Sequence, residues 1–185
     1  MTHSEMNNAV TYKKLSREDC HPGMLAKLNR YQESRRWWCE IDGVLTLKDD
    51  NLHIDDWNDQ QKIAIAKRFR RRIKDGGAVF GAYLDGDLIG EASIKHKLFG
   101  REHEYIQLSS LHVSLEHRSR GIGRELFRLA CAEAKRFGAK KLYISSQPSE
   151  ETQAFYKAVG CVPAAEISRK LYREMPSDRH LEYIL

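Results

Sequence analysis

One segment, LHVSLEHRSRGIGRELF at residues 111–127, constrains the fold of this 185-residue chain more than any other feature. Its start is typical of a strand, its middle is a basic turn with two glycines, and its end begins an amphipathic helix. Free backbone N–H groups and the positive end of a helix dipole point into such a turn, where glycine lets an anion approach the backbone. The segment therefore predicts a strand–turn–helix unit that binds an anion, and a pyrophosphate fits it best.

The turn differs from two common nucleotide-binding loops. It has no GxGxxG pattern followed by an acidic residue about 20 positions later, as a dinucleotide-binding fold requires. It also lacks the GxxxxGK[ST] pattern of a Walker A loop. Residues 118–141 carry eight Lys or Arg against two Glu, and Arg118, Arg120 and Arg124 add positive charge at the turn itself. This position favours an anionic cofactor as the reason for the net charge of +5.

The remaining pattern predicts one α/β domain over residues 1–185, with a mixed, mostly antiparallel sheet flanked by helices. No repeat, low-complexity tract or linker divides the chain. The turn at residues 85–87 suits a tight hairpin, and residues 37–58 are expected to form a polar, aromatic loop. The expected strands cover residues 10–15, 78–84, 88–95, 105–114, 141–145, 167–172 and 180–184, and the expected helices cover residues 22–31, 59–74, 122–137 and 150–159.

Composition excludes several classes of protein. With 41% hydrophobic and 31% charged residues, the chain is neither disordered nor fibrous. It has no apolar run of the ~18 residues that a membrane span needs and no signal-peptide pattern at its start, so a cytoplasmic location is expected. Because neither CxxC nor HExxH occurs, no metal site is expected, and the cysteines are expected to be free buried thiols. These are Cys20, Cys39, Cys131 and Cys161.

Two motifs occur in a fixed order along the second half of the chain. The first, [RQ]xxGx[GA] after a strand, is matched at Arg118, Gly121 and Gly123. The second, NxxAxxFYxxxGF on a later helix, is similar to SEETQAFYKAVGC at residues 149–161, with matches at Phe155, Tyr156 and Gly160. Together they resemble the GNAT superfamily of N-acetyltransferases, and the resemblance covers about residues 78–185.

Three departures from the family pattern stand in these motifs. Leu115 occupies a position where proline is frequent, and Ser119 one where glycine is frequent. Ser149 and Thr152 stand where asparagine and alanine are usual. None of these departures removes a backbone amide from the turn.

The resemblance implies that the chain binds acetyl-CoA as its cosubstrate. In such a site the residues before the turn lie along the pantetheine arm, and the amide of Val113 is positioned to hydrogen-bond the acetyl carbonyl. The backbone of residues 119–124 wraps the pyrophosphate, and Tyr156 reaches the thioester sulfur. The implied cofactor-binding residues are Leu111, His112, Val113, Arg118, Ser119, Arg120, Gly121, Ile122, Gly123, Arg124 and Tyr156.

Acetyl transfer to an amine also needs a proton acceptor and a donor to the leaving thiolate. A primary amine with a pKa near 10.4 is protonated at pH 7, and removing its proton costs about 4.6 kcal/mol. Many family members place a glutamate where this chain has Gln107, which cannot accept the proton. The candidate bases are therefore Glu91, Glu104, His112 or a water chain, although each could also be only a structural polar group. Tyr156 is the candidate donor, either with a lowered pKa or as a hydrogen-bond donor only, and its alternative is a buried core aromatic.

The acceptor is expected to be cationic, because Trp37-Trp38 and the acidic residues 49–59 lie where family members place the variable acceptor wall. A polyamine, an aminoglycoside-like compound, a lysine side chain or an N-terminal amine would suit them; core tryptophans beside a solvated loop are the alternative.

Direct transfer without a covalent enzyme intermediate is expected. The rival functions are a CoA-binding sensor without catalysis and a nucleic-acid-binding domain using the basic residues 68–74. A homodimer is a family-level expectation.

Overall fold

A seven-stranded sheet forms the centre of the computed structural model, which describes residues 9–185. Among its neighbouring strands only β6 and β7 are parallel, and the other pairs are antiparallel. The expected mixed, mostly antiparallel sheet is therefore confirmed. In spatial order the strands are β1 (Thr11–Lys14), β4 (Ala78–Leu84), β5 (Asp87–Ile94), β6 (Tyr105–Val113), β7 (Lys141–Ser146), β9 (Arg179–Ile184) and β8 (Val162–Pro163).

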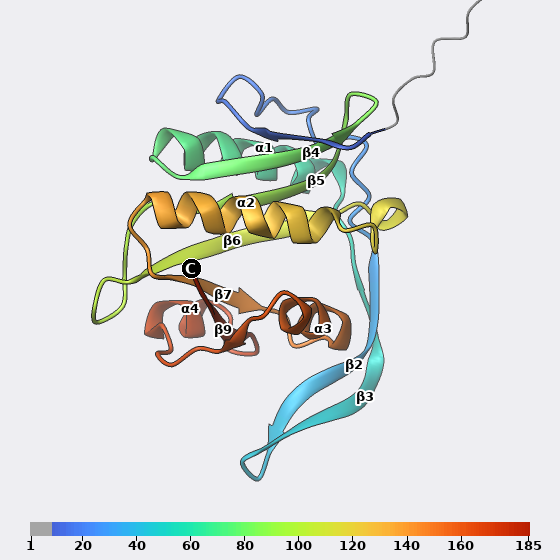
Figure 1. The fold of residues 1–185 in the computed structure, drawn as a ribbon. Coiled ribbons are helices and arrows are strands. Elements are labelled where there is room, and N and C mark those ends of the chain that lie inside the picture. Colours follow the sequence, from blue (N-terminus) through green and yellow to red (C-terminus); the bar gives the residue numbers. More distant parts are fainter. Residues whose placement is uncertain (1–8) are drawn as a thin grey trace, which may run out of the picture.

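Helices cover both faces of this sheet (Figure 1). Alternate residues of β4 belong to two apolar clusters: Phe80 packs with α2, whereas Val79 packs with α1. Successive side chains of a strand point to opposite faces, so α1 and α2 lie on opposite sides. Within residues 9–185, no helix has the length and apolar composition of a membrane span. The helices are α1 (Asp59–Lys74), the short 3-10 helix η1 (Leu115–His117), α2 (Ile122–Arg136), α3 (Glu150–Ala158) and α4 (Arg169–Glu174).

Local sequence signals explain several of these elements. Asn58 begins α1 with a capping box, in which Asn58 and Gln61 exchange side-chain to backbone hydrogen bonds of 2.9 Å. Asp85 and Gly86 form the two-residue turn between β4 and β5, with φ of 51° and 86°. Both values lie in the left-handed region that an Asp-Gly hairpin turn requires, so the expected hairpin is confirmed.

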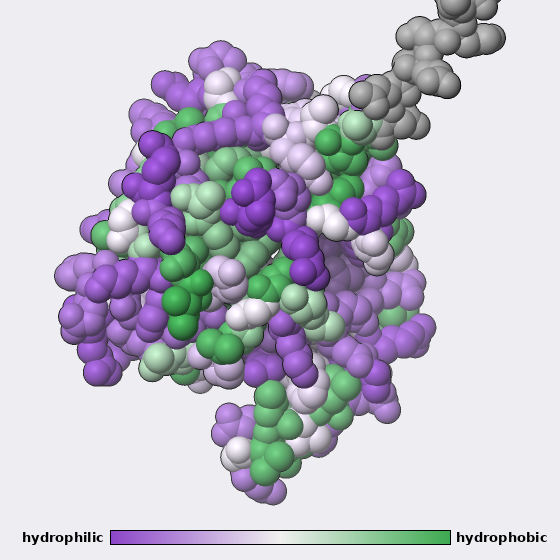
Figure 2. Space-filling model, viewed as in Figure 1, coloured by the Kyte–Doolittle hydropathy of each residue, from purple (hydrophilic) through white to green (hydrophobic). Residues whose placement is uncertain are grey.

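The expected loop at residues 37–58 is wrong, because most of it belongs to a second hairpin. Strands β2 (Gln32–Ile41) and β3 (Val44–Asp55) pair in antiparallel fashion as a separate two-stranded sheet. The turn between them is again Asp-Gly, with φ of 50° at Asp42 and 77° at Gly43. The hairpin projects from the body of the molecule (Figure 1), and Figure 2 shows apolar surface on it, where Val44 and Leu45 are exposed.

Two further expectations are wrong. Residues 22–27 form successive turns closed by hydrogen bonds between residues three positions apart, such as Leu28 N to Leu25 O at 3.0 Å, instead of a helix. The carbonyls of Arg30 and Tyr31 accept from the side chain of Arg118. Residues 167–172 do not form a strand: Ser168 caps α4 by accepting from the amide of Leu171. Besides β7, the strand that pairs with β9 is the two-residue β8, which precedes α4.

The sheet opens between its two parallel strands. Strands β6 and β7 pair over four positions, which end at Leu108 and Ile144. Beyond these residues β6 continues along β5, and β7 continues along β9. Ser109 is an extra residue in β6 relative to β5, and such a bulge bends a strand. The two strands therefore diverge at their carboxyl ends.

Candidate active site

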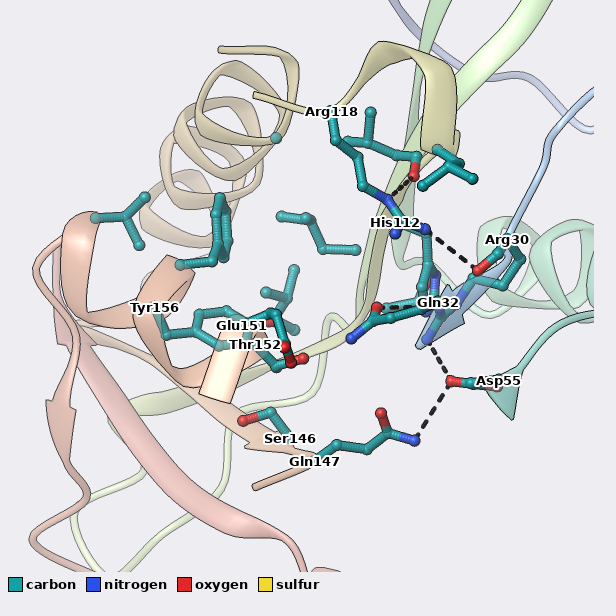
Figure 3. Close-up of a pocket in the computed structure, with 18 of the residues that line it drawn as sticks. Arg30, Gln32, Asp55, His112, Arg118, Ser146, Gln147, Glu151, Thr152 and Tyr156 are labelled. Carbon is teal, nitrogen blue, oxygen red and sulfur yellow. Dashed lines mark hydrogen bonds and ion pairs between the residues drawn. The ribbon is translucent and has the colours of Figure 1, made fainter. Parts of the chain in front are cut away.

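A cleft of about 1070 Å³ occupies the opening between β6 and β7 (Figure 3). One wall is the end of β6 with the turn that leads into α2, and the opposite wall is α3 with the end of β7. The segment before β2 and the end of β3 close the remaining side. Of the expected cofactor-binding residues, the cleft is lined by Leu111, His112, Val113, Arg118, Ser119, Gly121, Gly123, Arg124 and Tyr156.

The glycine turn has the geometry of an anion site. Gly121 begins α2 with a φ of 81°, and within residues 9–185 no side chain caps this helix end. The first amides of α2 are therefore available to a ligand, and the helix dipole makes this end positive. Gly123 is closely packed, because a Cβ there would lie 3.1 Å from the ring of Phe155. Two expected residues lie off the cleft lining: Arg120 is exposed beside the turn, and Ile122 is buried in the core.

Two of the departures from the family motifs have clear structural consequences. Ser119 adopts a φ of 61°, a conformation that favours glycine. Ser149 caps α3 by accepting from the amide of Thr152, and the two side chains hydrogen-bond at 2.9 Å. The Ser149–Thr152 pair therefore forms a local hydrogen-bond network at the start of α3.

The Val113 amide points into the opening of the sheet. The amide of Ser114 donates to the carbonyl of Ile89 on β5 at 2.8 Å. Because hydrogen-bonded and non-hydrogen-bonded pairs alternate along an antiparallel ladder, Val113 belongs to a non-hydrogen-bonded pair with Gly90. Its N–H therefore faces away from β5, toward the side from which β7 has diverged.

A buried carboxylate on β5 orients a histidine on the neighbouring strand β6. Glu91 is 0% exposed and lies directly opposite His112 in the β5–β6 ladder. Its Oε1 is 2.6 Å from His112 Nδ1, and its Oε2 accepts from the Ser110 hydroxyl at 2.8 Å. An ionised carboxylate only accepts, so Nδ1 donates to Glu91, and in the neutral imidazole Nε2 is then the acceptor. His112 and Ser110 line the cleft, whereas Glu91 lies behind them and does not.

The other candidate bases lie elsewhere. Glu104, at the far end of β6, forms an ion pair with Lys141 at 2.9 Å and does not line the cleft. Gln107 is also outside the lining. The structure therefore brings together Glu91, His112 and the Val113 amide and leaves Glu104 apart.

Tyr156 lies across the cleft on α3 and is buried at its wall. Burial raises the pKa of its hydroxyl above the ordinary value near 10. The phenol therefore stays protonated at neutral pH, and of the two expected alternatives hydrogen-bond donation is favoured over a lowered pKa. Burial likewise raises the pKa of the thiols of Cys131 and Cys161 to about 12, so neither is a ready nucleophile.

The acceptor end of the cleft contains residues that sequence reasoning missed. Arg30 is 7% exposed and pairs with Asp55 at 2.5 Å, and Gln147 also reaches Asp55 at 3.4 Å. The Trp57 ring packs edge-on against His112, with 4.7 Å between ring centroids. No motif signals these residues, because Arg30 and Asp55 meet only through the pairing of β2 with β3, and Trp57 follows that hairpin.

The expected acceptor wall is therefore corrected. Trp37 and Trp38 do not line the cleft; the amide of Trp38 instead donates to the carbonyl of Pro148 at 2.8 Å, which fastens the hairpin to the body. Within the acidic residues 49–59, the cleft is lined by Asp55 and Trp57. The acidic side chains nearer the hairpin tip lie elsewhere.

Comparisons with known proteins agree with this geometry. The family model described as the Acetyltransferase (GNAT) family matches residues 42–161. No curated protein sequence matches the chain. The structure of a nourseothricin acetyltransferase is 19% identical, with a TM-score of 0.69 over 95% of this chain and 98% of that chain. A Bacillus anthracis str. Ames protein assigned as a streptothricin acetyltransferase, solved with acetyl coenzyme A, is 14% identical, with a TM-score of 0.70 over 96% and 99%.

A Thermoplasma acidophilum N-acetyltransferase solved in complex with coenzyme A is 17% identical, with a TM-score of 0.59 over 96% of this chain and 99% of that chain. At such identities the structures show a shared fold. The family model, by contrast, covers well over half of the chain. The chain therefore belongs to the GNAT family of acetyltransferases, enzymes that use acetyl-CoA as cosubstrate.

Proposed function

We propose that this acetyltransferase acts on a primary amine of a cationic small molecule and uses His112 as the base. The observation that carries this proposal is the His112–Glu91 pair at the cleft wall, with an Nδ1–Oε1 distance of 2.6 Å. A neutral imidazole held by a buried carboxylate is a common arrangement for accepting a proton near neutral pH. It supplies the base that glutamine at position 107 cannot provide.

The turn residues are suited to hold the cosubstrate. The uncapped first turn of α2, the positive φ of Gly121 and the exposed side chains of Arg120 and Arg124 would receive the pyrophosphate. Bound there, acetyl-CoA would supply an acetyl group activated as a thioester. The Val113 amide would hydrogen-bond the acetyl carbonyl oxygen, and the Tyr156 hydroxyl would donate toward the sulfur.

In this proposal His112 acts as the general base and accepts the proton that the protonated amine must lose. For an amine with a pKa near 10.4, this loss costs about 4.6 kcal/mol at pH 7. Nε2 accepts the proton, and the negative charge of Glu91 stabilises the imidazolium that forms. Ser110 donates to the second oxygen of Glu91 and keeps the carboxylate in place.

A cationic acceptor is supported by the charges around the cleft. Glu33 and Glu151 both line it, and within residues 9–185 neither forms an ion pair with Lys, Arg or His. Trp57 adds an aromatic ring beside the base. These groups would attract a second ammonium of a polyamine or an aminoglycoside-like compound.

An amine panel tests the proposal. Wild-type protein, His112→Gln and the control His96→Gln, whose residue is exposed and outside the cleft lining, are incubated with acetyl-CoA and single acceptors. The acceptors are spermidine, kanamycin, nourseothricin, streptothricin and a lysine peptide with a free N-terminus, and mass spectrometry detects one added acetyl group. His112→Gln should lower kcat about 10²- to 10⁴-fold, whereas the control keeps it.

Two results would contradict the proposal. Equal turnover by His112→Gln and wild-type protein would exclude His112 as the base. Acetyl-CoA binding without acetylation of any acceptor would favour the CoA sensor.

A further inference from the structure

The arginine that opens the glycine turn directs its side chain away from it. Arg118 Nε donates to the carbonyl of Val113 at 3.0 Å, and its Nη2 donates to the carbonyls of Arg30 at 3.2 Å and Tyr31 at 2.8 Å. Three of the five N–H donors of this guanidinium are thus used by backbone. By contrast, Arg120 and Arg124 are exposed, and within residues 9–185 their side chains have no hydrogen-bond or ion-pair partner.

Further hydrogen bonds join the same two segments. The Asn29 amide donates to Ser114 Oγ at 2.8 Å, and the Leu115 amide donates to the Asn29 carbonyl at 3.0 Å. The Asn29 side chain reaches Glu116 at 2.5 Å. Residues 29–31 are therefore fastened along the start of the turn, and Arg118 supplies the bonds at the carboxyl end of this segment.

Residues 29–31 also support the side of the cleft where the acceptor is proposed to bind, because Arg30 and Tyr31 line it. The Arg30 side chain bonds Asp55 at 2.5 Å and Gln32 at 3.2 Å, as Figure 3 shows, and its guanidinium lies 5.8 Å from the centre of the Trp57 ring. That ring packs against His112. A shift of the Arg30 backbone would therefore move the groups that surround the base.

We propose that Arg118 is a positioning residue for the acceptor side of the cleft and not a ligand of the acetyl-CoA phosphates. It acts through Arg30 and Tyr31, whose carbonyls it holds. The inference rests on the proposed function, since it assigns acceptor binding to the side of the cleft that contains His112.

The substitution Arg118→Lys separates the two roles. Lysine keeps the positive charge that a phosphate contact needs, but its single ammonium cannot reproduce a planar fork that holds three carbonyls. We expect KM for spermidine to rise, and kcat to fall, by about tenfold or more, because small misplacements of a reacting group are costly. The dissociation constant of acetyl-CoA, measured by calorimetry, should stay within about twofold. The matched control is the double variant Arg120→Met/Arg124→Met, which should weaken acetyl-CoA binding about tenfold and leave KM for spermidine unchanged.

Hydrogen exchange gives a readout that needs no acceptor. Amides of residues 29–33 should exchange at least about tenfold faster in Arg118→Lys than in wild-type protein, and at the wild-type rate in the double variant. Unchanged exchange, or weakened acetyl-CoA binding with an unaltered KM for spermidine, would overturn the proposal. If wild-type protein acetylates no amine, the proposed function fails, whereas exchange and calorimetry still decide the role of Arg118. Should Arg118→Lys not fold, Arg118→Gln is measured in the same way.

Discussion

Replacing Glu91 with glutamine tests the proton-accepting pair while preserving its shape. In Glu91→Gln the amide oxygen can still accept from His112 Nδ1, and the new NH₂ can donate to Ser110. The Ser110 hydroxyl then donates to Ser93, which is 2.8 Å away. The side-chain positions are thus kept, at the cost of a surplus of hydrogen-bond donors, and the main quantity lost is the negative charge beside the imidazolium. We therefore expect a folded enzyme with a slower chemical step.

The size of this effect follows from the hydrogen bond between His112 Nδ1 and residue 91, whose acceptor changes from a charged carboxylate to a neutral amide. A hydrogen bond to a charged partner contributes about 1.5–3 kcal/mol, and a neutral one about 0.5–1.5 kcal/mol. The midpoints of these ranges differ by about 1.25 kcal/mol, which corresponds to nearly tenfold in rate. Because Glu91 does not line the cleft, the affinity for acetyl-CoA should stay the same.

The assay is steady-state release of coenzyme A, followed with a thiol reagent at saturating acetyl-CoA and varied acceptor. Glu91→Gln should show about tenfold lower kcat, and His112→Gln a larger loss of about 10²- to 10⁴-fold. The double variant should be no slower than His112→Gln alone, since Glu91 acts through the histidine. Wild-type kcat in Glu91→Gln, or losses that multiply in the double variant, would refute this reasoning.

Three further predictions concern single residues. Tyr156→Phe should lower kcat about tenfold or more without changing the dissociation constant of acetyl-CoA, and wild-type kcat would make Tyr156 a purely structural residue. Ser119→Gly should raise the free energy of unfolding in urea by up to about 1 kcal/mol, because the φ of 61° is unfavourable for serine; a loss of stability would contradict this. Labelled acetyl-CoA should leave no acetyl group on Cys161, whose buried thiol has a pKa of about 12, and a trapped acetyl-cysteine detected by mass spectrometry would overturn direct transfer.

The sequence predicted well those elements that local chemistry determines. The strand–turn–helix unit around Gly121, the helix at α3 and the Asp85-Gly86 hairpin all depend on residues close together in the chain. The second hairpin carried the same Asp-Gly signal at residues 42–43, but the charged and aromatic residues around it concealed the strand pattern. Its strands lie outside the main sheet, so they lack the regular burial that reveals a strand.

The expected helix at residues 22–31 was wrong for an instructive reason. Leu25 and Leu28 are both fully buried, as their spacing indicates. A spacing of three residues is nevertheless also met by consecutive turns that are closed by hydrogen bonds between residues three positions apart. The carbonyls of Arg30 and Tyr31 accept from Arg118 instead of from helical amides. Burial was therefore predictable here, and the backbone conformation depended on a tertiary contact.

Some residues of the candidate site could likewise be predicted from local sequence, and others could not. The turn residues and Tyr156 follow from motifs. The Glu91–His112 pair depends on the register of β5 against β6, and Arg30 and Asp55 meet through the return of a hairpin. These contacts join residues between 21 and 25 positions apart, so no local pattern could reveal them.

The central claim is that the acetyl group of acetyl-CoA is held between β6 and α3, beside His112. A crystal structure of the protein with acetyl-CoA tests it most directly. We predict that the acetyl carbonyl oxygen lies about 3 Å from the Val113 amide nitrogen, with the pyrophosphate on the amides that begin α2. A thioester bound away from the Val113 amide, or a pyrophosphate bound away from the glycine turn, would contradict the account.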